Sequence, residues 1–214
     1  MKRINYIASL IQNKKAIVAD IGSDHAFLAV TLLKNKQAKT VYNIELNQKP
    51  LETGIKNLKA NYVYKDTVNV INDGLKNWKK TKSFDYVVIS GMGGNNIIEI
   101  LKHAKVKIKN LILCPNNNAF AVRKYLSKSG WKFVHEAIIN ESKYFYPLMQ
   151  VSKTKGVKYS NNKDWYFGKL NLKQKDLNFV KMNKERLNYL KKNKIAKYNK
   201  KYAMEVKLLN DCSK

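Results

Sequence analysis

The sequence predicts an α/β fold in which a mostly parallel sheet carries helices on both faces, followed by a smaller helical unit. Three observations predict it. Short apolar segments alternate with helical patterns as far as about residue 128, which is typical of parallel strands joined by crossover helices. Two strand-like segments then follow each other with only a short polar turn between them. Beyond about residue 153 the chain is rich in lysine and reads as helical.

The first part of the chain supplies the parallel strands. Apolar residues at helical spacing from Ile4 to Ile11 predict a short amphipathic helix before the first strand. Five apolar segments predict strands over residues 16–21, 40–46, 68–72, 84–90 and 111–114. Helices are expected over residues 25–33, 50–60, 96–102 and 119–128. Pro50 lies in a first helical turn, where its missing N–H costs no hydrogen bond.

Residues 131–139 and 144–151 have the composition of strands and are separated only by a short polar turn. Such a short connection joins antiparallel strands, so we expect a hairpin at one edge of the sheet. Five parallel strands with a terminal antiparallel pair make the seven-stranded, Rossmann-like sheet of class I methyltransferases. A fold that only binds a dinucleotide does not need this hairpin.

The C-terminal part is expected to form a separate helical domain, so the predicted domains are residues 1–155 and 156–214. Apolar residues recur there close to heptad spacing, with a break near Asn193. Two helices that fold back on each other as an antiparallel coiled coil fit this pattern best. The residues that define the spacing are Val180, Leu187, Leu190, Tyr198, Tyr202, Val206 and Leu209.

The composition indicates a polyanionic partner. The chain has 42 Lys and Arg against 15 Asp and Glu, a formal net charge of +27, and 44% hydrophobic residues, which is too many for a disordered chain. Cationic side chains that neutralise phosphates release condensed counterions, which favours nucleic acid. The alternative is that an AT-rich coding sequence inflates the number of lysines without selection for binding.

Two cysteines, Cys114 and Cys212, stand in unrelated contexts. They indicate a reducing compartment and no zinc site. No segment approaches the roughly 20 apolar residues of a membrane span. We therefore expect a cytoplasmic protein that binds neither a membrane nor a metal. Its expected state is a monomer.

In a doubly wound sheet the ligand lies across the carboxyl ends of the strands. The scarce acidic residues and the glycines gather at the predicted strand ends. Gly22 lets the backbone approach a ligand, Glu45 follows at the distance of a residue that binds ribose hydroxyls, and Asp73 is placed to accept from an adenine amino group. The predicted cofactor-binding residues are Asp20, Ile21, Gly22, Ser23, His25, Glu45, Leu46, Asp73, Gly74, Gly91, Met92 and Gly93.

These features favour S-adenosylmethionine, a nucleoside with a cationic sulfonium, over a cofactor with a diphosphate. A diphosphate loop follows G-x-G-x-x-G without a nearby carboxylate, whereas Asp24 occupies the position of the second glycine here. An NAD-dependent oxidoreductase is the alternative that the fold alone allows. A non-catalytic RNA-binding protein on a degenerate version of the same fold is a third.

Four stretches resemble one family. VADIGSDHAFLAV, the SGMGG turn, CPNNNAFAVRKYL and the helical tail are similar to the bacterial tRNA (adenine-N1)-methyltransferases called TrmK. The similarity runs from about Lys2 to Gln150 with all motifs in order, and more loosely through the tail. The resemblance implies methylation of the adenosine at position 22, in the D-loop region of tRNA. Phe27, Cys114 and Asn118 stand where the family has tyrosine and often has glutamine and histidine, and the tail is shorter.

Methylation gives the adenine ring positive charge, and a carboxylate or amide that accepts from the exocyclic amine stabilises it. The expected catalytic residues are Asp24 and Asn116. Asp24 has an alternative role as a helix N-cap, and Asn116 as a turn residue after proline. A structural role is the stronger interpretation of His25.

The target base lies within folded tRNA, so it must be turned out of its stack and the surrounding backbone must be held by cations. For the lysines of the tail, the alternative is a solvated helix face. The predicted RNA-binding residues are Lys2, Arg3, Arg123, Lys191, Lys192 and Lys197.

Overall fold

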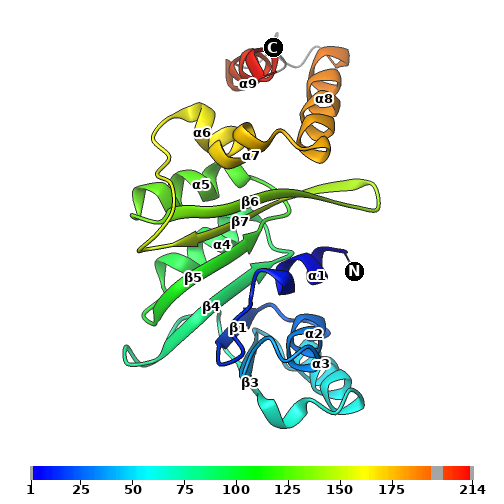
Figure 1. Cartoon of the computed structure of the whole chain (residues 1–214), viewed down its shortest axis with the longest axis vertical. Helices are drawn as coiled ribbons and strands as arrows, with labels where there is room; N and C mark the ends of the chain where they lie inside the picture. Colours follow the sequence, from blue (N-terminus) through cyan, green and yellow to red (C-terminus); the bar gives the residue numbers. More distant parts are fainter. Residues whose placement is uncertain (1, 194–199, 213–214) are drawn as a thin grey trace.

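The computed structural model describes residues 2–193 and 200–212 (Figure 1). Seven strands form one sheet in the order β3-β2-β1-β4-β5-β7-β6. All neighbours are parallel except the pairs β5–β7 and β6–β7. The sheet and the antiparallel hairpin at its edge are therefore confirmed. The strands are β1 (Ile17–Ile21), β2 (Thr40–Glu45), β3 (Thr67–Ile71), β4 (Ser83–Ser90), β5 (Lys107–Cys114), β6 (Lys132–Glu141) and β7 (Tyr144–Ser152).

Helices cover both faces because the apolar side chains of the strands alternate between two cores. Val18 and Leu148 belong to one core, whereas their neighbours Ala19 and Met149 belong to the other. The first core packs against α1 (Lys2–Ser9), α2 (Phe27–Lys34) and α3 (Gln48–Ala60). The second packs against α4 (Gly94–Lys102) and α5 (Ala119–Lys128), and a short helix, η1 (Tyr64–Asp66), precedes β3.

Two predicted boundaries were wrong for identifiable reasons. Helix α2 begins at Phe27 rather than at residue 25, because Asp24 and Ala26 both have left-handed backbone angles, with φ of 48° and 54°. Strand β5 begins at Lys107, four residues before the apolar segment, because Lys107 pairs with Ser83 of β4. A pattern of apolar residues does not predict how far a strand pairs with its neighbour.

The C-terminal helices extend the molecule beyond the β6 edge of the sheet (Figure 1). They are α6 (Asn162–Phe167), α7 (Lys169–Gln174), α8 (Leu177–Lys192) and α9 (Lys200–Cys212). Phe167, Phe179, Leu190 and Leu209 form a small core with Ile138 of β6. Helix α8 contacts α9, and Arg186 donates to both carboxylate oxygens of Glu205, at 2.7 and 3.1 Å.

The sequence did not predict α6 and α7, and the predicted coiled-coil residue Tyr198 lies outside the described residues. Within the described part of the chain, no helix is long and apolar enough to cross a membrane. The same residues contain no group of three or more His, Cys, Asp or Glu side chains arranged to hold a metal ion.

Candidate functional site

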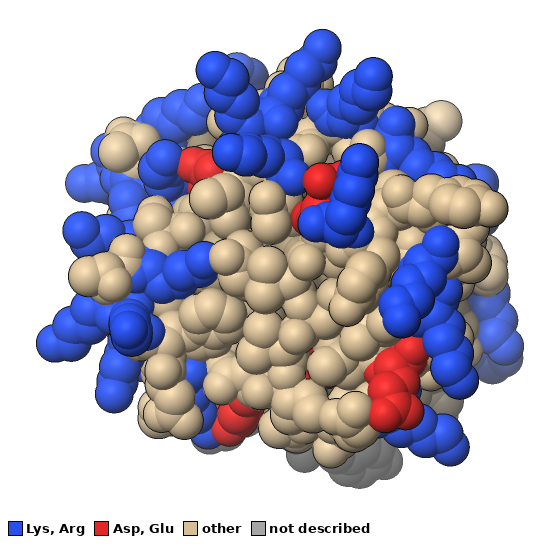
Figure 2. Space-filling model, turned by 90° about the horizontal axis from the view of Figure 1, so that it is seen from below, with Lys and Arg blue, Asp and Glu red and all other residues tan. Residues whose placement is uncertain are grey.

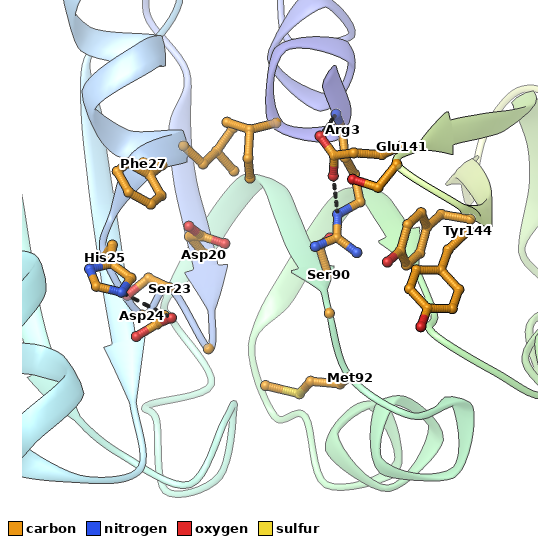
Figure 3. A pocket seen from close by; sticks show the side chains of 16 residues that line it. Arg3, Asp20, Ser23, Asp24, His25, Phe27, Ser90, Met92, Glu141 and Tyr144 are labelled. Carbon is orange, nitrogen blue, oxygen red and sulfur yellow. Dashed lines mark hydrogen bonds and ion pairs between the residues drawn. The ribbon is translucent and has the colours of Figure 1, made fainter. Parts of the chain in front are cut away.

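A cavity of about 770 Å³ opens at the carboxyl ends of β1 and β4, on the face that carries α1 and α2. Figure 3 shows its two walls. Asp20, Asp24, His25 and Phe27 lie on one side, and α1 and the tip of the β6–β7 hairpin form the other. We call this hollow the main cavity. It occupies the place where a doubly wound sheet binds its ligand.

Asp20 is the most strongly perturbed carboxyl group of the main cavity. It is the last but one residue of β1 and is only 6% exposed. Burial raises the pKa of Asp20 to about 7, and the nearby negative charge of Glu45 adds to this effect. Near neutral pH this group lies between its neutral and charged forms, and a cationic ligand in the cavity shifts it to the carboxylate.

The loop after β1 is held by Glu45 at the end of β2. One oxygen of Glu45 accepts from the backbone N–H of Asp24 and from the hydroxyl of Ser23, the latter at 3.3 Å. The Asp24 side chain is 70% exposed and lines the main cavity, 3.7 Å from the ring of His25. The N-cap position of α2 is Ala26, with no side-chain cap, so the capping interpretation of Asp24 is wrong.

A second hollow, of about 330 Å³, adjoins the main cavity. We call it the side cavity. Gly22 and Met92 line both hollows, and a Cβ added to Gly22 would lie 2.3 Å from the Met92 methyl carbon. Gly22 has a φ of 72°, so this close approach and this backbone both require glycine. The side cavity is also lined by Ile21, Ile44, Glu45, Leu46, Asn72, Asp73, Gly74, Lys76, Asn96, Glu99 and Ile100.

The side cavity combines apolar walls with acidic groups at one rim. Ile44 and Ile100 supply flat aliphatic surface, and Asp73 forms an ion pair with Lys76. Predicted residues Ile21, Glu45, Leu46, Asp73 and Gly74 therefore lie together here, whereas Asp20, Ser23, His25 and Gly91 line the main cavity. Gly93 lines neither hollow and instead faces the side chain of Asn117.

Asn116 connects the turn after β4 to the far wall. Its backbone N–H donates to Met92, at 2.9 Å, and its side-chain amide donates to the carbonyl of Gly91. Its side-chain oxygen accepts from Arg3, at 3.5 Å. Asn116 is not among the residues that line the main cavity, but its three hydrogen-bond partners Gly91, Met92 and Arg3 are.

The far wall of the main cavity contains residues that sequence reasoning missed. Glu141 accepts from the backbone N–H of Arg3 at 3.3 Å, and the guanidinium of Arg3 lies 4.4 Å from the ring centre of Tyr146. Burial acts to raise the pKa of Glu141, but its hydrogen bond and the charge of Arg3 hold that pKa below its ordinary value. Tyr144 is 55% exposed beside Tyr146. Strand periodicity alone places Tyr144 and Tyr146 on one face, which was the available signal.

The structure contradicts the prediction made for Arg123. It was expected to bind RNA, but it is only 2% exposed. Its side chain forms an ion pair with Glu136 at 2.7 Å and donates to the carbonyls of Trp165 and Tyr166. A guanidinium so enclosed cannot reach a phosphate, so the prediction for Arg123 is wrong.

The remaining predicted RNA-binding residues have different positions. Lys2 is exposed on α1, and Arg3 lines the main cavity. Lys191 and Lys192 are exposed in the last turn of α8. Lys197 lies outside the described residues. Cys114 is buried, and burial raises the pKa of its thiol to about 11, which disfavours the thiolate form.

Comparison with known proteins finds relatives in sequence and in structure. A family model described as TrmK, tRNA (adenine(22)-N(1))-methyltransferase, matches residues 18–211. The tRNA (adenine(22)-N(1))-methyltransferase of Bacillus subtilis is 32% identical over 151 residues, which cover 69% of this chain and 63% of that one.

Two solved structures match nearly the whole chain. The TrmK of M. capricolum, in complex with S-adenosyl-homocysteine, is 29% identical with a TM-score of 0.85, covering 100% of this chain and 96% of that one. A Streptococcus pneumoniae protein in complex with S-adenosyl-L-methionine is 27% identical with a TM-score of 0.88, covering 99% and 98%.

Proposed function

Because the chain belongs to the TrmK family of tRNA (adenine(22)-N(1))-methyltransferases, we propose that its two adjoining hollows hold the methyl donor and the target adenine. The enzyme transfers a methyl group from S-adenosylmethionine to N1 of adenosine 22 in tRNA. One observation carries the assignment of the site. Gly22 and Met92 contact each other and line both hollows, so the hollows adjoin along this pair and an elongated ligand that runs past it extends from one hollow into the other.

The residues present fit S-adenosylmethionine. Glu45 and Asp73 lie in the side cavity as acceptors for ribose hydroxyls and an adenine amine, and Ile44 and Ile100 supply apolar surface for the adenine ring. Asp20 lies on the main-cavity side of Gly22, where its carboxylate attracts a positive charge. The donor supplies a methyl group activated by a positively charged sulfur. A diphosphate would be repelled by these same acids, which argues against the oxidoreductase alternative.

We place the acceptor adenine against the far wall of the main cavity. Tyr144, Tyr146 and the Arg3 guanidinium offer flat surfaces on which a base stacks, and Phe27 faces them across the cavity (Figure 3). Adenine N1 is an unprotonated nucleophile near neutral pH. The wall therefore contributes mainly by fixing the direction of attack and excluding water.

We assign Asp24 as the acceptor for the exocyclic amine of the adenine. Its side chain is exposed in the main cavity, and Glu45 holds its backbone in place. Asn116 is then a positioning residue, because it holds the carbonyl of Gly91 and accepts from Arg3. Arg3 in turn belongs to the stacking wall.

We also propose the division into residues 1–155 and 156–214, with α8 and α9 as an antiparallel coiled coil that binds tRNA. The separate core around Phe167 and Leu190 and the ion pair between Arg186 and Glu205 support it. Lys191 and Lys192 are the tRNA contacts we assign there. Figure 2 shows lysine and arginine around the margin of the face seen from below, so positive charge is not confined to these helices. A tRNA substrate implies a cytoplasmic enzyme, and we expect it to act as a monomer.

The test is incubation with labelled S-adenosylmethionine and unmodified tRNA, followed by nucleoside analysis. We expect label in 1-methyladenosine, and no label when adenosine 22 is replaced by guanosine. Label in another nucleoside, or label that survives the replacement, would contradict the proposed target.

A further inference from the structure

A third hollow, of about 450 Å³, lies between the sheet and the C-terminal helices. We call it the amide groove. Three consecutive amide residues, Asn116, Asn117 and Asn118, line it from the loop after β5, and Met182 and Arg186 line it from α8. The comparisons and the methyl-transfer site described above assign no role to it.

The amide groove and the main cavity adjoin across one strand. Side chains of β7 alternate between its two faces, so Tyr144 and Tyr146 line the main cavity while Phe145 lines the amide groove. Asn116 lines the groove, and its side-chain oxygen reaches Arg3 of the main cavity at 3.5 Å. A ligand in one hollow is therefore separated from a ligand in the other by little more than the thickness of a strand.

The charges that line the amide groove are paired within the protein. Arg186 binds both oxygens of Glu205, and Tyr166 donates to the same carboxylate. Arg123 is paired with Glu136. Among the described lining residues, each cation thus has a carboxylate partner, and a phosphate would have to compete with it. The groove is therefore suited to an uncharged group.

The walls of the amide groove fit a flat ring with hydrogen-bonding edges. Phe120, Phe145 and Tyr166 supply aromatic surface. The side-chain oxygen of Asn117 accepts from Gly94, and the amide nitrogen of Asn118 donates to Asn95, so the amide nitrogen of Asn117 and the side-chain oxygen of Asn118 are the remaining polar groups of these two side chains. Aromatic stacking combined with amide contacts to base edges is how proteins bind unstacked nucleobases.

A cation stands beside this wall rather than within it. The ammonium of Lys124 lies 5.7 Å from the ring centre of Phe120 and 5.3 Å from that of Trp165. A base in the groove would place its phosphate near this side chain. The separation of an uncharged interior from an adjacent cation matches a nucleotide.

We propose that the amide groove receives a tRNA base next to the target adenosine, so that two neighbouring bases are held on opposite sides of β7. This inference rests on the proposed function. It explains how the target base is kept out of its stack, because a displaced neighbour removes one of its stacking partners.

The experiment blocks the amide groove with a larger side chain. Met182→Trp adds bulk inside it, and Met204→Trp adds the same bulk on α9 at an exposed methionine that does not line it. We expect Met182→Trp to lower kcat/KM for tRNA about tenfold, mainly through KM, as for the loss of one stacked base. The affinity for S-adenosylmethionine and the Tm should match those of the Met204→Trp control.

A second variant tests the groove independently, in case Met182→Trp disturbs the fold. Asn118→Gly removes an amide while glycine keeps the left-handed backbone, which has a φ of 51° at this position. We expect a KM increase of several fold with an unchanged affinity for the donor. An effect on Tm without an effect on KM would make Asn118 structural and count against the groove.

Fluorescence of 2-aminopurine separates this inference from the proposed function. The probe replaces the target adenosine or the nucleotide on either side of it. We expect a binding signal at the target in the unchanged enzyme and in Met182→Trp, and a signal at one neighbour that Met182→Trp abolishes. Normal methylation with silent neighbours would overturn the groove alone. Absence of methylation and of a signal at the target would overturn both proposals. Binding of free adenosine in the groove, without binding of a tRNA base there, would overturn the inference and assign the groove to a free nucleoside.

Discussion

Asp20 combines burial with proximity to a second carboxylate, Glu45, and its pKa of about 7 follows from both. A carboxyl whose pKa is raised on folding keeps its proton in the folded chain while the unfolded chain has lost it. Between the ordinary aspartate pKa of about 4 and the folded value, the folded state therefore binds more protons. The contribution of Asp20 to the free energy of unfolding therefore falls as the pH rises through this window.

The first prediction uses this linkage. Between about pH 4 and pH 7, the Tm of the ligand-free enzyme should fall relative to the Tm of Asp20→Asn, which lacks the titrating carboxyl. The affinity for S-adenosylmethionine should rise through pH 7 as the carboxylate forms, more than the affinity for S-adenosyl-homocysteine, which lacks the positive charge. Calorimetric titrations of both compounds across this pH range test it, and parallel pH profiles for the two would contradict the role of Asp20.

The second prediction concerns Asp24. Asp24→Ala should lower kcat about a hundredfold or more, because the exocyclic amine loses its acceptor. The affinity for tRNA should change little, since the side chain lies in the cavity rather than on a phosphate-binding surface. Single-turnover methylation and tRNA titration measure the two effects. Asp66→Ala, at an exposed residue of η1, is the control, and near-full turnover of Asp24→Ala would remove Asp24 from the mechanism.

At the scale of elements, a buried polar network joins the sheet to the C-terminal helices. Glu136 of β6 accepts from Arg123 of α5 and from Tyr159, whose oxygen accepts in turn from the backbone of Leu170. Gly168 between α6 and α7 has a φ of 83°, and a Cβ there would lie within 2.1 Å of Glu136. The network therefore fixes where α6 and α7 pack.

The third prediction follows from this network. Glu136→Ala should lower the free energy of unfolding by about 3–5 kcal/mol, because it leaves the Arg123 charge buried without a partner. The double variant Arg123→Met with Glu136→Leu should be less destabilised than Glu136→Ala. Denaturant unfolding of the three proteins decides it. If the double variant loses as much free energy of unfolding as Glu136→Ala, the unpaired charge of Arg123 is not the cause of the destabilisation.

The elements also show what the sequence could predict. The five parallel strands and the hairpin follow from apolar periodicity and connection length, so they were predictable. The positions of Asp20, Gly22 and Glu45 follow from the rule that ligands bind at strand ends. The wall made by Arg3 and Glu141 was not predictable, because these residues are 138 positions apart and meet only after the sheet has formed. The burial of Arg123 depends on α6 and α7, and no sequence pattern predicted these two helices.

Across the molecule, exposed lysines occur from α1 to α8, and Figure 2 shows lysine and arginine around the margin of one face, so only part of the net charge of +27 belongs to the tRNA contact. Cations that bind phosphates differ from the others in one measurable respect. Each one that displaces a condensed counterion contributes to the dependence of affinity on salt concentration.

The fourth prediction applies this to α8. Replacing Lys191 and Lys192 with glutamine should weaken tRNA binding and reduce the slope of log affinity against log salt by about one to two. The affinity for S-adenosylmethionine should stay the same. The control replaces Lys14 and Lys15, exposed residues before β1 at the opposite end of the sheet from the cavity. Equal salt slopes for the two double variants would leave α8 without a role in tRNA binding.

The bond between Glu45 and the loop that carries Asp24 has a consequence for timing. A ribose that binds this carboxylate shares it with the backbone of the loop. Binding of the donor therefore adjusts the position of the loop that tRNA then contacts. The two substrates are thereby expected to bind in order, small molecule before polymer, through one side chain that both depend on.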